Sequence, residues 1–111
     1  MNSTPDLQIY DPPMCCSTGV CGPAVDPALA AFSAFLGQMQ ERGTSVARHN
    51  LAQEPLAFVQ NSEVKVFLDL EGAEGLPLIF LRERRVLAGR YPDAEERLAW
   101  ARELLGSREA S

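Results

Sequence analysis

The sequence predicts an α/β fold with the element order β-α-β-α-β-β-α, in which helices flank a central mixed sheet of four strands. Short apolar or alternating runs indicate the strands, and apolar residues spaced three or four apart indicate the helices. A chain of 111 residues with 46% hydrophobic and 23% charged residues can bury one core but is too short for two. We therefore expect a single domain over residues 1–111, with its core at about 7–105 and a frayed tail at 107–111.

The first two elements are a strand and a helix. Residues 7–10 alternate in polarity and are followed by Asp-Pro-Pro at 11–13, which predicts that the strand stops there. Asp26 is suited to cap a helix that begins at Pro27 and ends near Gly43. The apolar face of this helix is expected to hold Leu29, Phe32, Leu36 and Met39.

The middle of the chain predicts a strand followed by two helical segments. Residues 45–51 read as the second strand, and residues 55–60 as a helical turn. A longer helix then begins with Asn61 or Ser62 as its cap and ends at Gly72. Its apolar face is expected to hold Val64, Phe67 and Leu68.

A hairpin is predicted where two apolar runs, 78–81 and 85–88, flank the charged turn 82–84. Four arginines gather around this hairpin: Arg82, Arg84, Arg85 and Arg90. They are candidates for contacts with DNA phosphates. With 10 basic and 15 acidic residues the net charge is −5, which favours the alternative of a solvated turn whose arginines pair with nearby Glu83.

The last helix is predicted to start with a capping box formed by Asp93 and Glu96 and to end at Gly106. Its inward face is expected to carry Leu98, Ala101 and Leu105. The large aromatic side chains are most simply interpreted as packing residues; these are Phe32, Phe35, Phe67 and Trp100.

Three cysteines, Cys15, Cys16 and Cys21, lie together between the first strand and the first helix, where open α/β sheets place their ligand sites. Adjacent cysteines form a strained disulfide, and an odd number cannot form a closed disulfide set. Most free cysteines are small buried hydrophobes, but the polar and glycine-containing neighbours here favour a ligating cluster. Structural zinc would require a fourth ligand, for which His49 is a weak candidate, whereas catalytic zinc commonly takes three protein ligands and a water. Three thiolates suit a soft trivalent ion such as As(III) or Sb(III).

Composition also bears on location. No uninterrupted apolar stretch approaches the ~20 residues of a membrane-spanning helix, and residues 1–13 lack the features of a secretory signal. We therefore expect a cytoplasmic protein with no membrane partner, whose cysteines are kept as thiols in a reducing compartment.

Four stretches, 11–22, 58–61, 72–78 and 88–92, resemble the ArsD family, and the similarity spans about residues 7–105. This family comprises arsenic metallochaperones that are also weak trans-acting repressors of arsenical-resistance operons. The resemblance implies a thioredoxin-like fold, a cis bond at Leu76–Pro77, and As(III) or Sb(III) cargo held by Cys15, Cys16 and Cys21, with no organic cofactor. The implied partners are the ArsA ATPase of an arsenite efflux pump and thiol donors such as glutathione. The additional vicinal cysteine pairs of many members are absent, which leaves one metalloid site per chain.

The sequence therefore predicts a binding protein rather than an enzyme. A second hypothesis is metalloid-responsive repression by a homodimer that binds operator DNA. A third is a thiol oxidoreductase or arsenate reductase. The third is disfavoured because four residues separate Cys16 from Cys21, instead of the two of a redox Cys-x-x-Cys motif.

Overall fold

The computed structural model describes residues 5–13 and 26–109, and it contains the predicted elements in the predicted order. The strands are β1 (Leu7–Asp11), β2 (Val46–Asn50), β3 (Leu78–Leu81) and β4 (Arg84–Ala88). The helices are α1 (Pro27–Glu41), α2 (Pro55–Gln60), α3 (Ser62–Glu71) and α4 (Ala94–Glu109), with a short 3₁₀ turn at Ala73–Gly75. None of the helices in these ranges is long and apolar enough to cross a membrane.

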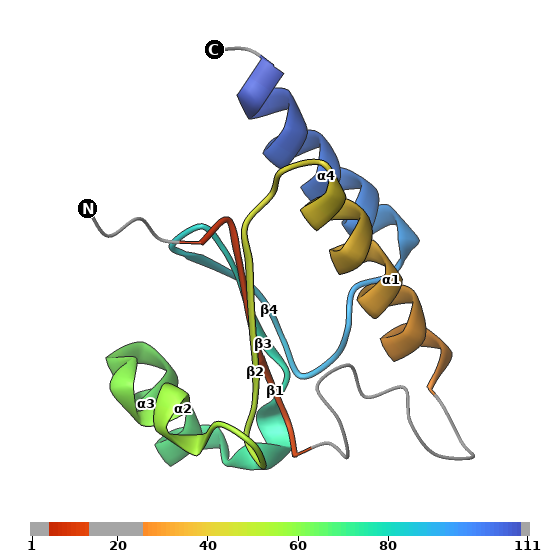
Figure 1. Ribbon diagram of the computed structural model, residues 1–111. Helices are drawn as coiled ribbons and strands as arrows, with labels where there is room; N and C mark the ends of the chain where they lie inside the picture. Colours follow the sequence, from red (N-terminus) through yellow and green to blue (C-terminus); the bar gives the residue numbers. More distant parts are fainter. Residues whose placement is uncertain (1–4, 14–25, 110–111) are drawn as a thin grey trace.

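The four strands form one mixed sheet in the order β2-β1-β3-β4. Strands β1 and β2 are parallel, whereas β1 with β3 and β3 with β4 are antiparallel. Helices α1 and α4 cover one face of the sheet, and α2 and α3 cover the other (Figure 1). The prediction of a mixed four-stranded sheet flanked by helices is confirmed.

Each face of the sheet has its own apolar cluster. Toward α1 and α4, the buried cluster consists of Leu7, Ile9, Phe32, Phe35, Leu36, Met39, Ile79, Leu81, Trp100 and Leu104. Toward α2 and α3, it consists of Tyr10, Phe58, Val64, Phe67, Leu76, Leu78 and Phe80. Alternation along β1 and β3 produces this division, because successive side chains of a strand point to opposite faces. The Leu76–Pro77 bond, immediately before β3, is cis as expected.

The predicted helix starts are confirmed by hydrogen bonds. The Asp26 carboxylate accepts a 2.9 Å bond from the Ala28 N–H at the start of α1. The Asn61 side chain accepts from the N–H groups of two residues in the first turn of α3. Before α4, the Asp93 N–H donates to Glu96 Oε1 at 3.0 Å, and the Glu96 N–H donates to Asp93 Oδ1 at 2.8 Å, which completes the capping box.

Two predictions about α4 are wrong. The helix continues through Gly106 to Glu109, and Gly106 is not among the glycines with a positive φ that would end a helix. Leu98 does not face inward but is 53% exposed, whereas Trp100 and Leu104 are buried. The inward face is centred between the 100/104 and 101/105 positions, which places Leu98 about a quarter turn away at its edge.

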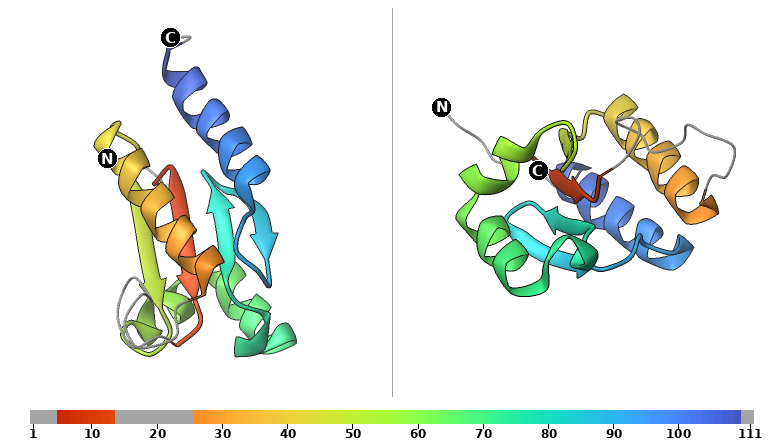
Figure 2. Two further views of the ribbon diagram at one scale, coloured as in Figure 1. Left: turned by 90° about the vertical axis from the view of Figure 1, so that its right-hand side faces the viewer. Right: turned by 90° about the horizontal axis from the view of Figure 1, so that it is seen from below.

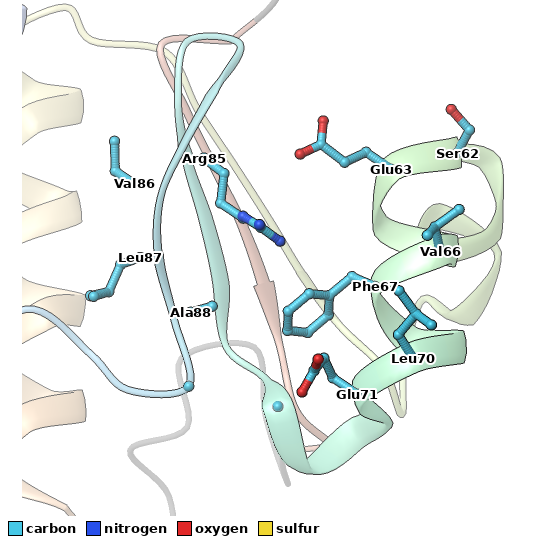
Figure 3. A pocket seen from close by; sticks show the side chains of 12 residues that line it. Ser62, Glu63, Val66, Phe67, Leu70, Glu71, Arg85, Val86, Leu87 and Ala88 are labelled. Carbon is cyan, nitrogen blue, oxygen red and sulfur yellow. The ribbon is translucent and has the colours of Figure 1, made fainter.

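The β3–β4 hairpin contains a bulge. Ile79 pairs with Leu87 and Phe80 with Arg85, so Val86 is an extra residue in β4. As a result, Val86 and Leu87 both pack toward α1 and α4, while Arg85 faces α3 (Figure 3). The turn is also one residue shorter than predicted, because Arg84 belongs to β4.

Candidate functional site

The predicted ligands Cys15, Cys16 and Cys21 lie outside the described residues, so their arrangement remains a prediction. The structure describes the two elements that flank their segment, β1 before it and α1 after it. Helix α1 begins near the carboxyl ends of β1 and β2, and the last turns of α4 lie at the opposite end of the molecule (Figure 2). At this end of the sheet, the polar contacts that the structure describes are centred on Asp11.

Asp11 is the last residue of β1 and is completely buried. One carboxylate oxygen, Oδ2, accepts a 2.6 Å hydrogen bond from Arg48 Nε, and the other, Oδ1, accepts a 2.6 Å bond from the Tyr91 hydroxyl. A buried carboxylate is costly unless its charge is paired and its oxygens are hydrogen-bonded. Both conditions are met here, so the charge is held at a defined position between three segments.

Arg48 of β2 connects this carboxylate to α1. Its Nη1 donates a 2.9 Å bond to Ser33 Oγ, and its guanidinium lies 5.6 Å from the centre of the Phe32 ring. The side chain is only 13% exposed. Its Nη2 is buried and has no hydrogen-bond partner among the described residues. The guanidinium is therefore oriented by β1 on one side and α1 on the other.

Tyr91 lies in the connection between β4 and α4. Burial raises the pKa of its hydroxyl well above the ordinary value of 10.0, and the hydrogen bond to Asp11 raises it further. The hydroxyl therefore remains protonated at neutral pH and acts as a donor to Asp11.

Sequence reasoning missed this group, since it interpreted Asp11 only as part of a strand stop. Two signals could have indicated it. One is the carboxylate of Asp11, directly before Pro12-Pro13 at the sheet edge where ligands bind. The other is Arg48, a charged residue within the short strand β2.

His49 lies on the other side of β2 from Arg48. Its Nδ1 is 3.0 Å from Glu54 Oε1, and its ring is 5.5 Å from that of Tyr10. His49 is therefore engaged by Glu54 and packed beside Tyr10. Within residues 5–13 and 26–109, no three His, Cys, Asp or Glu side chains gather in a way that could hold a metal ion.

Comparison with known proteins gives the family. The model of the family described as arsenical resistance operon protein ArsD matches residues 4–110. This chain belongs to the ArsD family. It is 51% identical over 94 residues to an arsenical resistance operon trans-acting repressor ArsD of Escherichia coli, covering 85% of this chain and 78% of that protein.

More distant ArsD proteins support the same assignment. A putative arsenical resistance operon repressor ArsD of Halobacterium salinarum is 32% identical over 91 residues, covering 81% of this chain and 84% of that protein. The crystal structure of an arsenical resistance operon trans-acting repressor from Bacteroides vulgatus superposes with a TM-score of 0.80 at 33% identity, covering 90% of this chain and 94% of that one. The ArsD fold of this chain is thioredoxin-like, as expected.

Two of the four hairpin arginines of this ArsD chain, Arg84 and Arg90, are engaged by carboxylates of α4. Arg84 Nη2 donates to both oxygens of Glu103, at 3.0 and 3.1 Å, and Arg90 donates to both oxygens of Glu96, at 2.7 and 2.9 Å. The Arg90 hydrogen bond lowers the pKa of Glu96, and the Asp93 N–H lowers it further. The prediction that these arginines pair with Glu83 is wrong: the carboxylates that engage Arg84 and Arg90 are Glu103 and Glu96 of α4.

The ArsD chain also has an open groove between α3 and β4 (Figure 3). Its lining includes the exposed apolar residues Val66 and Leu70 and the charged residues Glu63, Glu71 and Arg85. The Arg85 guanidinium lies 5.8 Å from the centre of the Phe67 ring. Among the residues that the structure describes, those lining the groove include no cysteine or histidine.

Proposed function

We propose that this ArsD-family protein binds As(III) or Sb(III) through Cys15, Cys16 and Cys21, transfers the ion to the ArsA ATPase of an arsenite efflux pump, and represses the arsenical-resistance operon. The observation that carries the proposal is the position of its thiols. All three cysteines of a chain from an arsenical-resistance family lie in the single segment between β1 and α1.

Binding is a ligand exchange in which atoms balance without an oxidant. Arsenite is As(OH)₃; each cysteine thiol forms one As–S bond and its proton leaves with one hydroxide as water, so three thiols release three waters. A soft trivalent ion prefers sulfur to oxygen. After the first bond has formed, the other two thiols act at high effective concentration.

Transfer follows the same exchange in reverse. A thiol of the acceptor forms an As–S bond and passes its proton to the departing cysteine sulfur, one sulfur at a time. The ion therefore remains bound to sulfur throughout. The segment between β1 and α1 and the adjoining first turn of α1 form the surface that approaches ArsA in this proposal.

Repression of the operon is supported by the relatives, which are named trans-acting repressors. A net charge of −5 and the engagement of Arg84 and Arg90 by α4 leave little free positive charge on the hairpin for phosphate contacts. We therefore expect weak, salt-dependent binding to operator DNA by a homodimer. Arsenite should abolish this binding; an unchanged DNA affinity in its presence would contradict metalloid-responsive repression.

X-ray absorption at the arsenic edge tests the cargo site. The reduced full chain incubated with arsenite should show three sulfur neighbours per arsenic, and replacement of any one of the three cysteines by serine should lower the affinity sharply. Ser17→Ala, in the same segment with all thiols retained, is the control and should bind like the unaltered chain. Oxygen-rich coordination of the arsenic would contradict the three-thiol site. Unchanged affinity in one serine variant would show that the replaced cysteine is not a ligand. The alternative function, a thiol oxidoreductase or arsenate reductase, is tested by an assay for catalytic turnover with a dithiol reductant. Turnover would support the enzyme, and its absence the binding protein.

A further inference from the structure

We infer that Asp11, Ser33, Arg48 and Tyr91 form a polar clasp that fixes both ends of the cysteine-bearing segment, and that these four positioning residues thereby increase its affinity for a trivalent metalloid. The inference rests on the proposed metalloid site. None of the four residues is taken to contact the ion.

The first step is the connectivity of the clasp. Residues 12–26 join the end of β1 to the start of α1. Asp11 immediately precedes this segment, and Ser33 lies in the second turn of the helix that follows it. Arg48, from the neighbouring strand β2, hydrogen-bonds to both residues, at 2.6 and 2.9 Å. A single guanidinium thus ties together the two elements between which the cysteines lie.

The second step is the rigidity of the clasp. A guanidinium is planar and presents its N–H groups at fixed angles, so bonds from Nε and Nη1 to two different elements define their relative position. Tyr91 holds the remaining carboxylate oxygen of Asp11 from a third element. The backbone of Asp11 is also held in place, because its carbonyl accepts a 3.2 Å hydrogen bond from the Leu51 N–H.

The third step is the cost of placing charge here. A buried ion pair gives little or no net stability compared with apolar residues of similar volume. Apolar side chains would therefore stabilise the fold at least as well at this position. The other buried residues of this layer are in fact mainly aromatic and aliphatic. Fixed geometry is the property that a hydrogen-bonded charge provides and an apolar contact does not.

The last step links the clasp to binding. Three sulfur ligands from one short segment must be ordered around one ion, and this ordering opposes binding. Fixing both ends of the segment reduces the number of conformations that must be given up. Loosening either end should therefore weaken metalloid binding without removing any ligand.

The test uses arsenite with the reduced full chain, and the affinity is measured by competition with a soluble dithiol. Ser33→Ala removes the α1 end of the clasp with little change in volume, and Ser33→Thr retains the hydroxyl. Leu7→Val is the stability control. Leu7 is fully buried at the other end of β1, and loss of one methylene there lowers stability by an amount similar to loss of one hydrogen bond. Arg48→Met, which cuts the clasp at its centre, is the stronger variant.

We expect Ser33→Ala to weaken arsenite binding several-fold and Arg48→Met by about tenfold or more. Ser33→Thr and Leu7→Val should bind like the unaltered chain, and all variants should retain three sulfur neighbours per arsenic. Unchanged affinity in Ser33→Ala, or an equal loss in Leu7→Val, would overturn the clasp while leaving the proposed site intact. Failure of the unaltered chain to bind arsenite through sulfur would overturn both.

Discussion

At the scale of single residues, Asp11 shows how a buried charge can be kept in a small domain. Its side chain has no exposed surface, yet each oxygen has a donor at 2.6 Å, one of them cationic. Removing a partner from such a group leaves an uncompensated charge, which is more costly than never having buried it. The integrity of this end of the sheet thus depends on a few polar atoms.

Tyr91 provides a pH-dependent test of this arrangement. Its raised pKa means that the folded protein keeps the hydroxyl proton at a pH at which the unfolded chain, with an ordinary pKa of 10.0, has lost it. The unfolded state is then favoured, so the free energy of unfolding should fall as the pH rises above about 10. Urea unfolding at several pH values should show a shallower fall for Tyr91→Phe than for the unaltered chain. Parallel curves for the two proteins would mean that the hydroxyl is not held as described.

Little of this polar group was predictable from the sequence. Arg48 and Tyr91 lie 37 and 80 positions from Asp11, and nothing local in the chain indicates contacts of such separation. The cysteines were detected because they cluster in sequence. Asp11, in contrast, was interpreted through its local role beside two prolines, and its partners became visible only when β1, β2 and the segment before α4 were brought together.

At the scale of elements, local chemistry predicted where helices begin better than which face they bury. The caps at Asp26, Asn61 and Asp93 depend on side chains within three residues of the helix start, which a sequence displays directly. The inward face of α4 depends instead on how the helix is rotated against the sheet. Leucines at 98, 104 and 105 do not reveal that rotation by spacing alone.

Two leucines of α4 form a matched pair for measuring this rotation. Leu104 is 1% exposed and Leu98 is 53% exposed. Leu104→Ala should lower the free energy of unfolding by about 2–5 kcal/mol, as cavity-forming changes do, whereas Leu98→Ala should cost less than about 1 kcal/mol. Denaturant unfolding of both variants measures the difference. Equal losses would place Leu98 in the core, as the sequence alone had predicted.

At the scale of the whole molecule, the fold was predictable because each element is consistent with its neighbours. Alternating or apolar runs, capped helices and glycine stops all occur in an order that a mixed sheet with two helical layers accommodates. The resemblance to ArsD added the thioredoxin-like arrangement and the cis Leu76–Pro77 bond. Residue patterns alone would not have supplied either.

The whole chain should respond to its cargo as a single unit. A ligand that binds only the folded state adds about 2.7 kcal/mol at a concentration one hundred times its dissociation constant, and somewhat less here because unfolded thiols also bind arsenite. Thermal unfolding should therefore shift upward with arsenite and saturate at one arsenic per chain. The variant with Cys15, Cys16 and Cys21 all replaced by serine should show no shift. Stabilisation that persists in this variant would point to a different site.

The extra residue in β4 has a consequence for self-association. Strand β4 is at the edge of the sheet, and its ladder to β3 is interrupted at Val86. An irregular edge presents its free N–H and C=O groups at uneven spacing, so it is a poor template for adding a further strand from another molecule. Deleting Val86 would restore regular spacing and, with it, a route to intermolecular β-aggregation that the present sequence avoids.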